Sequence, residues 1–297
     1  MTGPERGFLL LTSHLGNPDR KVLTTAQLRT LSQRMKNAPA PIEDRDLEAR
    51  DLIALGYGTE MAERILTLLS EEDLLEYYLR RGEKAGCVPL TRVSPGYPME
   101  LLDKLGMEAP GCLWAKGDLT LLNSRKLSLV GSRDLNPLNA EFAGEAGRQA
   151  ARQGYTLVSG NARGADKTGQ NAALDAGGKV ISIVADELSK HSNRENVLYL
   201  SEDCFDEPFS AQRALSRNRC IHALGEKTLV AQSSYQHGGT WDGTVKNLRF
   251  GWSPVFCFDD GSPATQLLEE MGASLIGLDE LTDLEALQGC EDNFLGR

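Results

Sequence analysis

The stretch that decides the fold is residues 155–176, which read YTLVSGNARGADKTGQNAALDA. It opens with a short apolar run, Tyr155–Ser159, whose aromatic and β-branched side chains are typical of a strand. A turn containing two glycines follows, and the apolar spacing from Asp166 to Ala176 predicts a helix. A buried strand, a glycine-containing turn and a helix in this order indicate one unit of a parallel α/β sheet.

The same alternation recurs on both sides of this stretch. Further strands are predicted at Leu127–Val130, Val180–Val184, Thr228–Ala231 and Val255–Phe258. Further helices are predicted at Leu138–Gln153, Ser216–Ala223, Trp241–Gly251 and Ala264–Met271. Strands that are apolar throughout and separated by helices predict an α/β fold, an extended Rossmann-like parallel sheet with helices on both faces.

The N-terminal part of the chain lacks strand patterns. We expect a small all-helical region over residues 1–90 and the Rossmann-like domain over residues 91–297. The features expected in the first region are a helix at Glu5–His14, a helix starting at a Thr24–Gln27 capping box, a linker at Asn37–Pro41 and helices within Asp46–Arg81. The Gly56–Gly58 turn between two short helices is similar to SAM-like or helix-hairpin-helix units, which serve either as packing units or as grips on a DNA backbone.

Composition limits the class of protein. With 40% hydrophobic and 25% charged residues the chain is typical of a globular protein. No apolar run approaches the ~18 residues of a membrane span, and no signal peptide precedes the first helix, so we expect a cytoplasmic protein. The 6 cysteines and 4 histidines are scattered without close pairs. We therefore expect no metal and no cofactor.

The net charge of −10, from 32 basic and 42 acidic residues, is unusual for a nucleic-acid-binding protein. Exposed charges are screened beyond a Debye length of about 8–10 Å. The positions of the basic residues are therefore more informative than their sum.

Loops that follow the strands carry the candidate binding residues, because ligands of open parallel sheets sit beyond the carboxyl ends of the strands. Four loops or helix starts combine glycines, hydroxyls and cations that suit phosphate. The candidate phosphate-binding residues are Gly131, Ser132, Arg133, Ser159, Gly160, Arg163, Gly164, Asp166, Arg217, Asn218, Arg219, Gly238, Gly239, Thr240 and Lys246.

Several of these residues carry a more specific expectation. Asp166 is expected to cap the helix that it begins. Arg217 and Arg219 project about 200° apart on one helical turn, so one is expected to face a ligand while the other braces a carboxylate. Trp241 is either a stacking platform for a base or a core anchor. The glycine loops match neither the Walker A pattern nor GxGxxG.

Taken in order, these motifs resemble the DprA/Smf family of DNA-processing proteins. The resemblance rests on Gly131-Ser132-Arg133, on Ser159-Gly160-x-Ala162-Arg163-Gly164-x-Asp166, on Arg217-Asn218-Arg219-x-Ile221 and on the Gly-Gly-Thr loop, preceded by Tyr97-Pro98-x-x-Leu101 and Leu113-Trp114-x-x-Gly117. It covers well over half of the chain.

The resemblance implies a recombination mediator without catalytic residues. Such a protein binds single-stranded DNA, forms a homodimer and helps to load a RecA-type recombinase. The five cations Arg133, Arg163, Arg217, Arg219 and Lys246 would then hold phosphates. Gly164-Ala165-Asp166 replaces the family's Gly-Ile-Asp, residues 188–202 lack its usual Gly- and Pro-rich stretch, and the chain ends at Arg297. We therefore expect a divergent member without the winged-helix module, acting in DNA processing or defence.

Two other classes of function remain open. The same phosphate loops can hold a free nucleotide, as in a nucleotide-sensing or regulatory module. Related Rossmann-like folds also include phosphoribohydrolases, which need a carboxylate near the glycosidic bond. The nearby carboxylates for that role are Asp242 and Asp166.

Overall fold

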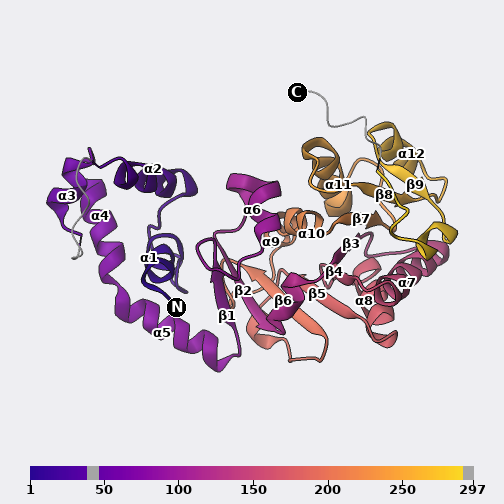
Figure 1. Ribbon diagram of the computed structural model, residues 1–297, viewed down its shortest axis with the longest axis horizontal. Coiled ribbons are helices and arrows are strands. Elements are labelled where there is room, and N and C mark those ends of the chain that lie inside the picture. Colours follow the sequence, from indigo (N-terminus) through magenta and orange to yellow (C-terminus); the bar gives the residue numbers. More distant parts are fainter. Residues whose placement is uncertain (39–46, 290–297) are drawn as a thin grey trace.

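The computed structural model describes residues 1–38 and 47–289, in which a helical N-terminal region lies beside a nine-stranded sheet (Figure 1). The helices of the first region are α1 (Gly3–Thr12), α2 (Thr25–Lys36), α3 (Ala49–Ala54), α4 (Thr59–Ser70) and α5 (Glu72–Lys84). The predicted capping box is confirmed, because Gln27 N donates to Thr24 Oγ1 at 3.2 Å and Thr24 N donates to Gln27 Oε1 at 3.0 Å. Most of the predicted linker, from residue 39 onward, lies outside the described residues.

The helical region has a small core of its own. The turn at Gly56–Gly58 separates α3 from α4 as predicted, and their apolar faces pack on α1 and α2. The buried Arg20 side chain donates to the backbone oxygens of Leu10, Ser13 and Leu68. These bonds satisfy carbonyls at the ends of α1 and α4, and so fix the two helices to each other.

The sheet belongs to the second region and contains all the predicted strands. Its strands are β1 (Val88–Thr91), β2 (Cys112–Gly117), β3 (Lys126–Val130), β4 (Thr156–Ser159), β5 (Lys179–Val184), β6 (Val197–Glu202), β7 (Lys227–Val230), β8 (Val255–Phe258) and β9 (Ser274–Ile276). They lie in the order β1-β2-β6-β5-β4-β3-β7-β8-β9, and β3 to β9 are parallel. β1 and β2 form an antiparallel edge on β6.

Helices cover both faces of this sheet, as the sequence predicts. They are α6 (Met99–Leu105), α7 (Pro137–Arg152), α8 (Ala165–Asp175), α9 (Ala211–Ser216), α10 (Asn218–Leu224), α11 (Gly238–Phe250) and α12 (Pro263–Glu270). Leu127 and Leu129 pack in one core with α7 and α8, whereas Val130 packs in a second core with α10 and α11. Successive side chains of a strand point to opposite faces, so each strand supplies both cores.

The antiparallel edge and two further strands are absent from the sequence prediction. β1 spans the predicted domain boundary at residues 90 and 91 and pairs with β2 from Val88↔Ala115 to Thr91↔Cys112. β6 follows β5 with only a short 3-10 turn between them, and β9 is three residues long. A search for strands separated by full helices therefore does not find them.

Side chains of α5 join the helical region to the sheet. Tyr78 packs edge-on against Trp114 of β2, with ring centroids 5.5 Å apart. Its hydroxyl donates to Asp206 Oδ1 at 2.7 Å, and Arg81 pairs with the other oxygen of Asp206 at 2.9 Å.

Within the described ranges, no helix is both long and apolar enough to cross a bilayer.

Candidate nucleic-acid interface

The point where strand order reverses lies between β3 and β7, and the predicted loops gather there. The loop after β3 carries Gly131 and Arg133, and the loop after β7 leads to Gly238 at the start of α11. Residues of both loops line a cavity of about 340 Å³. Next to it, the loops after β4 and β5 line a second cavity of about 400 Å³. Both cavities lie at the carboxyl edge of the sheet, where ligands of such folds bind.

The loops after β3 and β4 are in direct contact at Gly164. Its φ of +81° lies in the region that favours glycine. A Cβ built at this position would lie 2.2 Å from the carbonyl oxygen of Ser132. Ala165 N donates to the same oxygen at 3.1 Å. The glycine therefore allows the two loops to close on each other and to present their outer faces together.

The expectation that Asp166 caps α8 is wrong. The N-cap residue is Gly164, and Asp166 lies inside the first turn of the helix. Its buried carboxylate reaches back to the preceding loop and accepts the N–H of Ala162 at 3.0 Å. Burial raises the pKa of this carboxyl group, and the positive charge of Arg217 acts in the opposite direction. Asp166 thus stabilises the loop from within.

Arg217 also lies inside the protein, with 6% of its surface exposed. It connects α9 to α10, and its guanidinium donates to the backbone oxygens of Gly160 and Ile183. These two oxygens lie at the ends of β4 and β5, so the side chain joins the strand ends beneath both cavities. Its Nε atom is buried without a hydrogen-bond partner in the described structure.

The hydroxyl and amide candidates likewise form hydrogen bonds to neighbouring protein groups. Ser159 is fully buried and accepts a hydrogen bond from Gln170 at 2.6 Å. Ser132 Oγ bonds both backbone groups of Asp134, and Asn218 Nδ2 donates to Gly239 O at 3.0 Å. Gly160 leaves no room for a Cβ because Arg217 fills that space. Gly131, Gly238, Gly239 and Thr240 line the cavity at the switch point.

Arg133 and Arg163 are the cations that face outward at the switch point, and both line the second cavity. Arg163 pairs with Asp134 at 2.7 Å, but the two side chains are 75% and 81% exposed. Such an exposed pair contributes at most about 1 kcal/mol, so a phosphate can displace the carboxylate. The guanidinium of Arg133 lies 5.9 Å from the ring centre of Phe209, an exposed phenylalanine.

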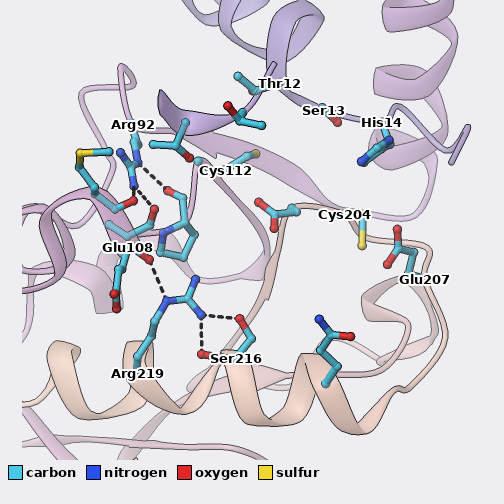
Figure 2. Close-up of a pocket in the computed structure, with 18 of the residues that line it drawn as sticks. Thr12, Ser13, His14, Arg92, Glu108, Cys112, Cys204, Glu207, Ser216 and Arg219 are labelled. Carbon is cyan, nitrogen blue, oxygen red and sulfur yellow. Dashed lines mark hydrogen bonds between the residues drawn. The ribbon is translucent and has the colours of Figure 1, made fainter. Parts of the chain in front are cut away.

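The remaining two cations, Arg219 and Lys246, line a larger groove of about 810 Å³ between the helical region and the sheet. Arg219 reaches toward the backbone of Glu108 and toward Ser216, while Thr12, Ser13 and His14 form the opposite wall (Figure 2). Arg219 also pairs with Glu202 at 3.0 Å. Arg219 thus braces a carboxylate, as expected of one of the two arginines. The expectation that the other arginine faces a ligand does not hold for Arg217, because its guanidinium is buried and donates to two backbone oxygens.

The groove and the switch-point cavity form one continuous surface. Leu215, Asn218 and Gly239 line both. Lys246, which lies further along α11, is exposed in the groove. Trp241 is buried in the core beside α10, which supports the core-anchor alternative, and it packs 6.1 Å from the exposed Tyr235 ring.

Two residues that the sequence analysis does not name line the second cavity, Asp186 and Phe209. Tyr235, which it also does not name, is half exposed on the loop after β7 beside Trp241. An aromatic residue in a loop that follows a strand is the sequence signal that could have found Phe209 and Tyr235. Asp186 follows β5 directly, so the rule that selects loops after strands applies to it as well.

The fold and the site together define a Rossmann-like protein with glycine-containing loops and exposed arginines at the carboxyl edge of its sheet. A family model described as DNA recombination-mediator protein A matches residues 89–276, more than half of the chain. The chain belongs to this family.

The similarity extends to individual proteins of known name. The chain is 29% identical over 170 residues to DNA processing protein DprA of Bacillus subtilis, a match covering 53% of this chain and 56% of that protein. It is 29% identical over 204 residues to DprA of Streptococcus pneumoniae, covering 64% and 71% of the two chains. The chain thus spans little more than half the length of the Bacillus protein.

Solved structures agree with this fold. The X-ray structure of DprA from S. pneumoniae superposes with a TM-score of 0.67 at 25% identity, covering 89% of this chain and 94% of that one. DNA processing protein A from Helicobacter pylori, whose structure concerns its single-stranded DNA binding mode, superposes with a TM-score of 0.56 at 22% identity. That match covers 66% of this chain and 94% of that one.

Proposed function

We propose that this protein binds single-stranded DNA as a recombination mediator. The observation that carries the proposal is the pair of exposed arginines, Arg133 and Arg163, at the sheet edge beside the exposed ring of Phe209. Arginines neutralise phosphates and an aromatic face stacks on an unpaired base, which is the combination that single-strand binders use. The groove that continues to Lys246 extends the path for a strand.

The contacts of the five candidate cations support phosphate binding by three of them. Arg217 is bonded to carbonyl groups and Arg219 is held by Glu202, which leaves Arg133, Arg163 and Lys246 of the five candidates. Each phosphate neutralised on a single strand lowers the slope of log K against log salt by about 0.7. We therefore expect a slope of about −2 for the protein, from three such contacts.

The test is a titration of a labelled single-stranded oligonucleotide, followed by fluorescence anisotropy at several salt concentrations. Arg163→Ala should weaken binding and make the slope shallower by about 0.7, with little change in stability. The matched control is Arg80→Ala, because Arg80 is 69% exposed and pairs with Glu76 on α5, away from the cavities. Equal effects of the two substitutions, or no binding by the unaltered protein at low salt, would refute the assigned interface.

Features inherited from the family remain part of the same proposal. We infer a cytoplasmic homodimer that delivers a RecA-type recombinase to the bound strand without catalysing a covalent step. Light scattering tests the dimer, and recombinase filament assembly on protein-coated DNA tests the delivery. Of the two carboxylates named for a phosphoribohydrolase, Asp166 lines the switch-point cavity but is buried, and Asp242 lines the groove instead.

Nucleotide sensing is the second candidate, supported by the size of the cavity that Arg133 and Arg163 line. Its volume of about 400 Å³ suits one small molecule. A free nucleotide at 100 times its dissociation constant would stabilise the protein by about 2.7 kcal/mol. Thermal unfolding with a panel of nucleotides distinguishes this candidate, because a strand-binding protein should show weak shifts with monomers and a large shift with an oligonucleotide.

A further inference from the structure

A carboxylate lies among the arginines of the second cavity. Asp186 follows β5 and lines this cavity together with Arg133, Arg163 and Phe209. A carboxylate repels phosphate, so its presence is unexpected in a site that serves only to bind the DNA backbone. Its side chain is 50% exposed, which leaves it accessible to a ligand.

The carboxylate is held in place and ionised. His191 Nε2 lies 2.9 Å from Asp186 Oδ1, and because a carboxylate accepts only, the histidine is the donor. The His191 side chain is 15% exposed and packs against the Tyr199 ring. The bond from His191 lowers the pKa of Asp186, with a further contribution from the charge of Arg217. A carboxylate has about four acceptor positions, so those that His191 does not use remain for a ligand.

DNA offers few groups that can satisfy such an acceptor. The phosphates and the ether oxygens of deoxyribose only accept hydrogen bonds, whereas the bases carry N–H donors. Cytosine, adenine and guanine each have an exocyclic amino group, and Asp accepting from cytosine N4 is a known pairing. Thymine and uracil have one N–H between two carbonyl oxygens, and both of those oxygens repel a carboxylate.

We propose that Asp186 is a specificity-determining residue that accepts a hydrogen bond from the exocyclic amino group of a base held in the cavity beside Phe209. This inference rests on the proposed single-strand binding. In this arrangement Arg133 and Arg163 hold the backbone, Phe209 stacks on the base and Asp186 contacts its edge. The protein then binds strands rich in cytosine, adenine or guanine more tightly than strands of thymine.

The test compares oligodeoxycytidine with oligodeoxyuridine of equal length at neutral pH, by competition for the labelled strand. The two polymers share backbone, ring size and charge. They differ at C4, where cytosine has an amino group and uracil a carbonyl group, and at N3, which is an acceptor in cytosine and an N–H between two carbonyl groups in uracil. We expect the unaltered protein to bind the cytosine polymer about tenfold more tightly, within the range of one base contact. Asp186→Asn should reduce this ratio to about twofold or less, because the amide serves carbonyl and amino groups alike.

The matched control is Glu187→Gln, which removes the same charge one residue further along, outside the residues that line the cavity. It should preserve the ratio. Equal binding of the two polymers by the unaltered protein overturns the inference, as does an Asp186→Asn variant that binds both more tightly with the ratio intact. In either case salt-dependent binding that Arg163→Ala weakens leaves the proposed function standing. Failure of both polymers to bind overturns the proposed function itself.

Discussion

Replacing Arg217 with methionine distinguishes two roles that its sequence position allows, a phosphate contact and an internal structural brace. A phosphate contact would lose DNA affinity on substitution while the folded state kept its stability. The structure instead places the guanidinium beneath the cavities, bonded to Gly160 O and Ile183 O and electrostatically coupled to Asp166. We therefore expect Arg217→Met to destabilise the fold first and to weaken binding as a consequence.

The magnitude follows from what the substitution leaves behind. Arg217 and Asp166 are 6% and 7% exposed, so screening by water is weak. Removing one partner from buried, charged groups costs about 3–5 kcal/mol, since the other charge and the freed carbonyls stay desolvated. For a chain of this size we expect the melting temperature to fall by roughly 6–15 °C.

The pH dependence identifies the mechanism. Burial raises the folded-state pKa of Asp166, so its contribution to stability is present at low pH and is lost as pH rises through that pKa. Without Arg217 the pKa rises further. The destabilisation should therefore be largest near neutral pH and should shrink as pH falls, because protonation removes the buried charge from both proteins.

Urea unfolding of the single variants Arg217→Met and Asp166→Asn and of the double variant forms a complete thermodynamic cycle. The double variant should be more stable than additivity predicts, because the neutral amide no longer needs a cation, with a coupling of about 1–3 kcal/mol. Two outcomes would refute this account and restore Arg217 as a phosphate contact. One is that the two losses of unfolding free energy add strictly in the double variant. The other is a stable Arg217→Met protein in which only the salt dependence of DNA binding becomes shallower.

Two further predictions concern stability. Gly164→Ala should lower the free energy of unfolding by about 2–5 kcal/mol, because the new Cβ meets the Ser132 carbonyl at a positive φ. Gly154 has a similar φ but free space around it, so Gly154→Ala should lower that free energy by only about 1–2 kcal/mol. Urea unfolding of both variants tests whether the contact between the loops causes the difference. Burial lowers the pKa of His222 from 6.5 to about 3, so its stabilising effect is present above pH 6.5 and is lost as pH falls. The free energy of unfolding should therefore drop by up to about 1.4 kcal/mol per pH unit below that point, and His222→Asn, which titrates nowhere in this range, should show a correspondingly flatter profile.

The strands and helices of the parallel sheet could be predicted from sequence because burial on both faces leaves a strong pattern. Leu127 and Leu129 serve one core and Val130 the other, so the strand is apolar throughout. β2 has no such continuity, since Lys116 and Gly117 end it at the antiparallel edge. β6 is apolar, but it follows β5 without a helix, and the alternation rule does not anticipate two strands in direct succession.

The site shows a different limit. The motifs predict which loops meet at the sheet edge, and Gly164 confirms it through the close approach to Ser132. They do not predict which way a side chain points, because Arg163 and Arg217 have the same chemistry. Arg217 becomes internal only because β5 ends beside β4 and supplies a second carbonyl. That juxtaposition is a property of the folded sheet and is absent from the local sequence.

The acidic net charge is consistent with a nucleic-acid interface once the side chains are placed. The exposed cations Arg133, Arg163 and Lys246 lie on one continuous surface, and beyond about 8–10 Å the acidic remainder is screened. A protein of net charge −10 nevertheless gains little long-range attraction for a strand. In the proposed complex, affinity then depends on short-range contacts, namely stacking on Phe209 and hydrogen bonds to a base edge. Such contacts require unpaired bases, and this favours a single strand over a duplex, in which the same edges are already paired.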